Sequence, residues 1–149
     1  MYRTILVPLD GSKRAEAILP HVEEVAHRYD ARVILLQVVE PIPVVMDGAG
    51  VTPALDPLII DELTKDAKSY LAKTQEELRK KGIVARTHVA FGPAVPTILG
   101  LAQREHVDLI AMASHGRSGL PRVFYGSVAA GVLHGVDRPL LLVRSKAWE

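Results

Sequence analysis

Short apolar runs rich in β-branched residues recur along the chain, and they constrain its fold more than any other feature. The five runs are Thr4–Leu9, Arg32–Val39, 84–91, 108–112 and Leu140–Val143. The second and fifth contain four consecutive apolar residues, whereas a strand with one solvated face would alternate. Continuous apolar runs are typical of strands that are buried on both faces, as in a parallel sheet. The runs therefore predict a parallel sheet that is covered on both sides.

Segments of helical periodicity separate these runs, namely 15–29, 57–81, 94–105 and 127–134. Pro20 lies inside the first segment and predicts a kink or a late helix start. Gly82 follows the second segment and predicts its end. Alternating strands and helices indicate an α/β fold with right-handed crossovers. We therefore expect a single three-layer α/β/α domain that spans residues 1–149.

One stretch, 41–56, breaks this alternation. It carries three prolines and two glycines and has no usable periodicity. We therefore predict a long mobile loop between the second strand and the second helix. Loops longer than about 12–15 residues are usually functional or disordered, and the composition leaves both interpretations open.

The composition excludes several classes of chemistry. The 149 residues contain no cysteine, which excludes disulfides, thiol catalysis and Cys-ligated zinc. The 18 Lys+Arg against 17 Asp+Glu and the 5% of aromatic residues argue against nucleic-acid binding. The first apolar run is too short for a signal peptide, and no window approaches the ~20 apolar residues of a spanning helix. We therefore expect a cytoplasmic protein without a membrane partner.

Polar residues follow the first strand, where Asp10-Gly11-Ser12 leads into a helix. In open parallel sheets, ligands bind beyond the carboxyl ends of the strands, where the strand order reverses. The oxygens of Asp10 and Ser12 could cap the helix that follows. Alternatively, Asp10 could accept a hydrogen bond from an amine or hydroxyl of a ligand. Both interpretations remain open at this point.

A glycine-bearing loop follows the fourth strand and leads into Gly126-Ser127 at the start of a helix. Backbone N–H groups in such loops and at helix N-termini bind anions. Arg117 and Arg122 could neutralise phosphate charge, and residues 113–149 hold 5 Lys+Arg against 2 Asp+Glu. Glycines also simply form turns, and the loop matches neither a Walker A motif nor a dinucleotide fingerprint. The loop thus indicates either an anion site or an ordinary turn.

The polar stretches and two of the strands together resemble the universal stress protein family. The stretches that carry the resemblance are Val7-Pro8-Leu9-Asp10-Gly11-Ser12, residues 108–119, Gly126-Ser127-Val128-Ala129 and Arg138-Pro139-Leu140-Leu141-Leu142-Val143. They occur in the family's order and run through essentially the whole chain. The resemblance implies a five-stranded parallel sheet of order 3-2-1-4-5 with helices on both faces. It also implies a homodimer, formed through the last strand, Leu140–Val143, and protein partners that remain unidentified.

Some members of this family bind ATP through the pattern G-x-x-G, nine residues, then G-(S/T). Gly116 and Gly126-Ser127 match it here, whereas Ala113 stands in place of the first glycine. If the backbone requires a positive φ at this position, alanine costs on the order of 1 kcal/mol. The resemblance implies that Asp10 and Val38 contact adenosine. The whole implied ATP site comprises Pro8, Asp10, Val38, Met112, Ala113, His115, Gly116, Arg117, Gly126, Ser127 and Val128.

Catalytic and metal-binding residues are harder to assign. His115 is a candidate base or phosphate donor, but it could equally cap a strand end. No Asp–His pair is evident beside Ser114 or Ser118, so we assign no catalytic residue. The other histidines share no metal-ligating spacing, so we expect no metal site built by the protein alone. Mg²⁺ would come only with nucleotide phosphates, near Asp10.

Three functions therefore remain in view. The first is an ATP-binding module of stress response or signalling with little or no turnover, at most slow hydrolysis or autophosphorylation. The second is a dimeric interaction protein that does not bind ATP, with Ala113 as the sign of the loss. The third is an enzyme of phosphoryl or adenylyl transfer that uses His115 or Asp10.

Overall fold

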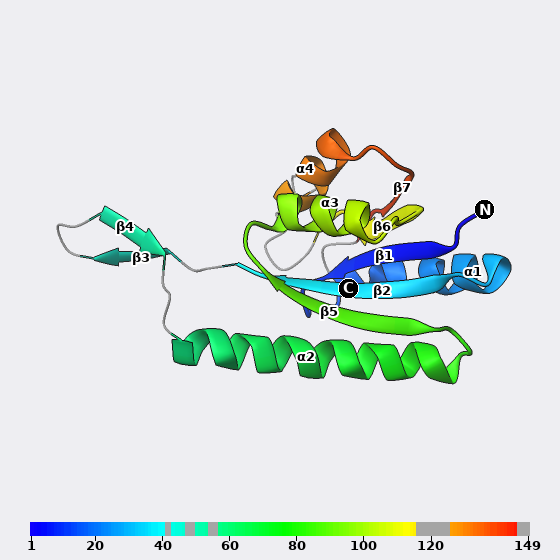
Figure 1. The fold of residues 1–149 in the computed structure, drawn as a ribbon, viewed down its shortest axis with the longest axis horizontal. Coiled ribbons are helices and arrows are strands. Elements are labelled where there is room, and N and C mark those ends of the chain that lie inside the picture. Colours follow the sequence, from blue (N-terminus) through cyan, green and yellow to red (C-terminus); the bar gives the residue numbers. More distant parts are fainter. Residues whose placement is uncertain (41–42, 47–49, 54–56, 116–125, 146–149) are drawn as a thin grey trace.

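The computed structural model describes residues 1–40, 43–46, 50–53, 57–115 and 126–145. Its main sheet contains β1 (Thr4–Leu9), β2 (Arg32–Val39), β5 (Ala85–Phe91), β6 (Leu109–Ala113) and β7 (Leu140–Val143). All four pairings are parallel, and the order across the sheet is β5-β2-β1-β6-β7 (Figure 1). This is the order 3-2-1-4-5 that the resemblance implies. The predicted bounds of β1, β2 and β7 agree with the structure to the residue.

Helices cover both faces of this sheet. Successive strand residues point to opposite sides, and apolar side chains on both sides are buried under helices. In β1, the side chains of Ile5 and Val7 enter the core beneath η1 (Ala15–Ile18), α1 (Leu19–Tyr29) and α2 (Pro57–Lys80). Leu6 enters the opposite core, beneath α3 (Ala94–Arg104) and α4 (Ser127–Gly135). Figure 1 shows α2 below the sheet and the pair α3 and α4 above it. The predicted three-layer α/β/α arrangement is confirmed.

Proline and glycine set two helix boundaries as the sequence predicts. Pro20 occupies the first turn of α1, which begins only after the 3-10 turn η1, so the late start is confirmed. Gly82 follows α2 with φ +79°, a conformation that glycine adopts without strain. Ile83 then donates its N–H to the carbonyl of Leu78 at 3.0 Å, which closes the helix end.

The predicted loop at 41–56 contains secondary structure that the sequence did not indicate. Within it, β3 (Pro43–Met46) and β4 (Gly50–Pro53) pair antiparallel as a separate two-stranded sheet, seen at the left of Figure 1. The prediction of a segment without strands was therefore wrong for these residues. Each strand has only four residues, and Pro43 lies opposite Pro53. Such short, proline-flanked strands carry no measurable periodicity.

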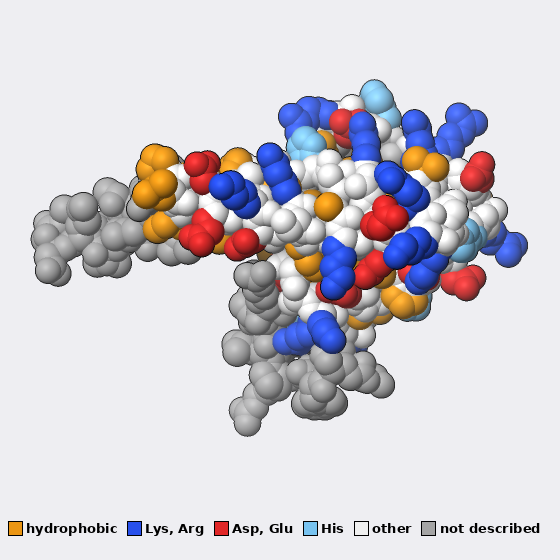
Figure 2. Space-filling view, turned by 90° about the horizontal axis from the view of Figure 1, so that it is seen from below, with side chains coloured by type: hydrophobic (Ala, Val, Ile, Leu, Met, Phe, Trp, Pro, Cys, Tyr) orange, Lys and Arg blue, Asp and Glu red, His pale blue; other side chains and the backbone are white. Residues whose placement is uncertain are grey.

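Charged side chains of both signs cover the outer face of α2. Figure 2 shows basic and acidic groups interspersed along it. Exposed acidic residues such as Asp66 and Glu76 separate exposed basic residues such as Lys65 and Arg79. This is the pattern of a solvated helix face. Within the described ranges, no helix is both long enough and apolar enough to cross a membrane.

The helices α3 and α4 approach each other closely because α4 carries two glycines at their contact. A Cβ at Gly131 would lie 2.6 Å from Cγ2 of Val95. A Cβ at Gly135 would lie 2.8 Å from Cδ1 of Leu99. Real Cβ atoms essentially never come this close to a carbon atom, so a larger residue at either position would have to displace the side chain of Val95 or Leu99.

Candidate functional site

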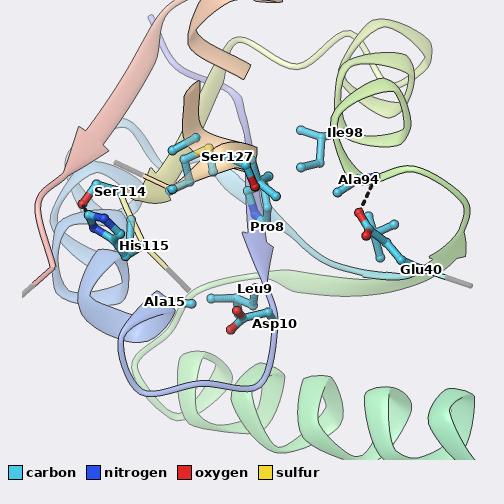
Figure 3. Close-up of a pocket in the computed structure, with 16 residues that line it drawn as sticks. Pro8, Leu9, Asp10, Ala15, Glu40, Ala94, Ile98, Ser114, His115 and Ser127 are labelled. Carbon is cyan, nitrogen blue, oxygen red and sulfur yellow. Dashed lines mark hydrogen bonds between the residues drawn. The ribbon is translucent and has the colours of Figure 1, made fainter. Parts of the chain in front are cut away.

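A cleft of about 460 Å³ lies at the carboxyl ends of β1, β2 and β6 (Figure 3). The first turns of α3 and α4 complete its walls. From β1 the chain builds β2 and β5 on one side, whereas β6 and β7 lie on the other, so the strand order reverses between β1 and β6. Ligands of doubly wound sheets bind at this reversal, and the volume falls within the ~300–1,000 Å³ of small-ligand sites.

The structure brings most of the predicted ATP-site residues together around this cleft. The predicted residues that line it are Pro8, Asp10, Val38, Met112, Ala113, His115, Gly126, Ser127 and Val128. Gly116, Arg117 and Arg122 lie outside the described residues. Sequence reasoning did not assign the remaining lining residues to the site, namely Leu9, Ala15, Glu40, Ala94, Ile98, Ser114 and Ala129.

Asp10 shapes the turn that leaves β1. Gly11 has φ +86°, and Oδ1 of Asp10 accepts hydrogen bonds from the N–H of Ser12 at 2.9 Å and from its hydroxyl at 2.6 Å. The Ser12 hydroxyl oxygen in turn accepts the N–H of Ala15 at 3.2 Å, where η1 begins. Ser12 therefore takes up an N–H at the start of η1, while Oδ1 of Asp10 closes the turn before it. Asp10 also lines the cleft.

The N-terminus of α4 opens onto the cleft, and no side chain among the described residues caps it. Gly126 precedes the helix in an extended conformation, and its N–H donates to the carbonyl of Ser114 at 2.6 Å. The first bond within the helix joins the N–H of Ala130 to the carbonyl of Gly126. The N–H groups of the first turn, beginning at Ser127, therefore have no partner within the helix. Such groups, with the positive end of the helix dipole, attract anions.

The N-terminus of α3 also borders the cleft, but a carboxylate caps it. Oε1 of Glu40, just beyond β2, accepts the N–H of Ala94 at 2.9 Å. Among the described lining residues, Asp10 and Glu40 are the acidic side chains. Figure 3 shows Glu40 and Ala94 on one side of the cleft and Ser114 with His115 on the other. The lining of the cleft therefore includes two carboxylates, Asp10 and Glu40, and the backbone N–H groups at the start of α4.

Ala113, which replaces the first glycine of the family pattern, carries no backbone strain. It is the last residue of β6, pairs with Val143, and does not have a positive φ. The conditional cost of about 1 kcal/mol for a positive φ therefore does not arise. Its side chain is 6% exposed and belongs to the wall of the cleft.

Ser114 and His115 form a buried polar pair at the end of β6. The hydroxyl oxygen of Ser114 lies 3.1 Å from Nδ1 of His115. The other ring nitrogen, Nε2, is buried and has no hydrogen-bond partner among the described residues. One ring nitrogen is thus held at the strand end, as one sequence interpretation suggested. Within the described residues, no group of three or more His, Asp or Glu could hold a metal ion.

Sequence comparisons connect this chain with known proteins. The model of the universal stress protein family matches residues 1–144. Universal stress protein MJ0577 of Methanocaldococcus jannaschii is 29% identical over 98% of this chain and 97% of its own length.

Solved structures with a similar fold include further universal stress proteins. The structure of protein MJ0577 covers 98% of both chains with a TM-score of 0.84 and 28% identity. Universal stress protein UspA from Lactobacillus plantarum has a TM-score of 0.79 at 29% identity, covering 96% of this chain and 98% of its own. A universal stress protein from Archaeoglobus fulgidus, solved in complex with dAMP, has a TM-score of 0.65. The match covers 95% of this chain and 98% of its own. Its identity of 21% supports the fold alone.

Proposed function

The chain belongs to the universal stress protein family, and from this premise we propose that it is a nucleotide-binding module of stress response or signalling. ATP would occupy the cleft at the ends of β1 and β6, with little or no turnover. We also propose a homodimer formed through β7.

The observation that carries the proposal is the polarity of the cleft. The N-terminus of α4, which no described side chain caps, offers backbone N–H groups that suit phosphoryl oxygens, and the ring of His115 lines the same cleft. Asp10 and Glu40 offer carboxylate oxygens elsewhere on the wall, which suit the amine and hydroxyl groups of a nucleoside. A nucleotide carries both kinds of group on one molecule. Mg²⁺ would enter only with the phosphates.

The geometry of the polar pair supports slow or absent turnover. The Ser114 hydroxyl lies 3.1 Å from Nδ1 of His115. In a serine nucleophile activated by histidine, a third group orients the imidazole, whereas Nε2 of His115 has no hydrogen-bond partner among the described residues. Oδ1 of Asp10 is already engaged by two hydrogen bonds from Ser12. The cleft therefore supports binding better than chemistry.

Calorimetric titration tests the proposal directly. We expect purified protein to bind ATP, with an affinity that changes when Mg²⁺ is withheld, and to release little phosphate over hours. Adenosine, dAMP and GTP serve as comparison ligands. No retained nucleotide after purification and no heat at millimolar ATP would overturn nucleotide binding and leave the dimeric interaction protein as the function. Steady phosphate release would instead favour the enzyme.

A variant of Asp10 tests the assignment of the cleft. Asp10→Asn keeps an oxygen that can accept the hydrogen bonds of Ser12 but removes the negative charge. We expect adenosine and ATP to lose about ten- to hundredfold in affinity, the usual value of a hydrogen bond to a charged group. Asp66→Asn, on the exposed face of α2, is the matched control and should bind as the wild type does. Equal affinities in all three proteins would place the ligand elsewhere.

A further inference from the structure

The pair formed by Ser114 and His115 raises the question of which ring nitrogen carries the proton. Both residues are buried, at 2% and 5% exposure, directly after the last residue of β6. In a neutral imidazole, one nitrogen donates a hydrogen bond and the other accepts one. The distance of 3.1 Å between the Ser114 hydroxyl oxygen and Nδ1 fits either direction. The neighbours of the hydroxyl decide between them.

A backbone N–H beyond β7 fixes the role of the Ser114 hydroxyl. The N–H of Ser145 lies 3.3 Å from this oxygen, and since a backbone N–H only donates, the oxygen accepts there. The hydroxyl proton then needs an acceptor of its own, because a buried donor without one is costly. Among the bonds that the structure gives this hydroxyl, Nδ1 of His115 is the group that can accept it. A neutral His115 therefore carries its proton on Nε2.

Nε2 lies at the start of α4. The ring carbon bonded to it, Cδ2, is 3.9 Å from the position that a Cβ on Gly126 would occupy. Nε2 itself is buried without a partner among the described residues, in a ring that lines the cleft. No described side chain caps the first turn of α4, which begins at the next residue, Ser127. The ring of His115 and this first turn thus line the same cleft.

We propose that Ser114 is a positioning residue that orients His115 so that its Nε2–H donates to a phosphoryl oxygen of the bound nucleotide. This inference rests on the proposed function and assigns Ser114 a role within it. Ser114 itself does not touch the ligand. It accepts the N–H of Ser145 and donates to Nδ1, so the imidazole proton is kept on Nε2.

Calorimetry with ATP and with adenosine separates this role from a structural one. Wild-type protein should bind ATP more tightly than adenosine. Ser114→Ala should lower the ATP affinity about tenfold while the adenosine affinity stays unchanged, because only the phosphate donor is lost. Ser69→Ala, on the exposed face of α2, is the matched control for both ligands. An equal loss for ATP and adenosine in Ser114→Ala would overturn the inference.

Two substitutions of His115 provide a rescue test. His115→Gln places an amide whose oxygen can accept the Ser114 proton and whose nitrogen can donate from the region of Nε2. We expect it to keep most of the affinity difference between ATP and adenosine. His115→Asn is too short to donate there and should lose that difference. Equal behaviour of the two variants would contradict the assigned donor.

The protonated nitrogen can also be identified without a ligand. Imidazole ¹⁵N chemical shifts distinguish the two neutral forms of histidine. We expect the Nε2–H form in the wild type, and a mixture of forms in Ser114→Ala. A wild-type Nδ1–H form would overturn the inference even if ATP binds. If the protein bound adenosine as tightly as ATP, the role of Ser114 and His115 would be overturned, while nucleoside binding would stand. If it bound neither ligand, the proposed function itself would be overturned.

Discussion

The phenolic hydroxyl of Tyr70 donates a hydrogen bond to Oε2 of Glu16 at 2.9 Å, and so joins the middle of α2 to η1. Burial of the ring raises the pKa of Tyr70 well above its ordinary value near 10. The hydrogen bond to Glu16 and the negative charges of Glu16 and Asp10 act in the same direction. A hydrogen bond involving Thr74 opposes them in part.

This contact predicts a loss of stability at alkaline pH. Because the pKa of Tyr70 is higher in the folded than in the unfolded chain, its contribution is fully present below about pH 10 and is lost as the pH rises above that value. Urea denaturation at pH 8 to 11 should therefore show a steeper fall in the free energy of unfolding for the wild type than for Tyr70→Phe. Parallel curves for the two proteins would contradict the contact.

Removal of the carboxylate that caps α3 should weaken the fold. Glu40→Ala leaves the N–H of Ala94 without its acceptor, and we expect the free energy of unfolding to fall by about 1 kcal/mol. Glu40→Gln keeps an amide oxygen and should lie between this variant and the wild type. Chemical denaturation measures all three proteins. Glu62→Ala, exposed on α2, is the control, and an equal loss there would mean that the cap contributes nothing.

A side chain at Gly126 should impair ligand binding in proportion to its size. A Cβ there would lie 3.4 Å from the carbonyl oxygen of Ser114, so Gly126→Ala fits closely and Gly126→Val places further methyl groups beside His115. We expect the valine variant to lose about ten- to hundredfold in ATP affinity, as overpacking usually costs 1–3 kcal/mol.

Gly100→Ala is the matched control for this experiment. It lies inside α3, where nothing approaches its added Cβ within 4 Å. Alanine in a helix interior is favoured over glycine, so this variant should gain up to about 1 kcal/mol of stability and bind ATP normally. Retention of full affinity by Gly126→Val would move the phosphates away from α4.

The edge strand β7 should mediate dimerisation. Its four apolar residues are only half-buried, and β6 is its partner in the described sheet. The carbonyls of Pro139 and Val143 accept the N–H groups of Ile110 and Ser114, within and directly after β6. Because backbone groups alternate in direction along a strand, those of Leu142 face outward. Light scattering should give the mass of two chains for the wild type and of one chain for Leu142→Lys, because an edge lysine discourages strand pairing. Val84→Lys, at a residue 67% exposed before β5, should stay dimeric. A monomeric wild type would refute the assignment.

Local patterns were sufficient to predict the strands of the main sheet and its three layers, whereas the strand order was implied by the family resemblance. The bounds of β1 and β2 follow from β-branched residues in unbroken runs, and the start of α1 follows from Pro20. Both signals act over a few neighbouring residues, so they are visible in sequence. The strands β3 and β4 were missed because pairing of Pro43 with Pro53 leaves no local pattern.

The candidate site was predictable where a motif marks it and not where distant residues meet. Asp10 and Gly126 belong to recognisable stretches, and both line the cleft. Glu40 is an ordinary acidic residue whose partner, Ala94, lies 54 positions away. Ser145 meets Ser114 across 31 positions, through a backbone N–H that every non-proline residue possesses. Only the packing of the strands brings such pairs together.

The glycines of α4 have a consequence for how this cleft could change. The first turns of α3 and α4 form two of its walls, and Gly131 and Gly135 leave room for the side chains of Val95 and Leu99 where these helices meet. A methyl group added at either glycine would have to displace one of these two side chains, and neither of them lines the cleft. The packing that supports two walls of the cleft therefore depends on positions outside its lining.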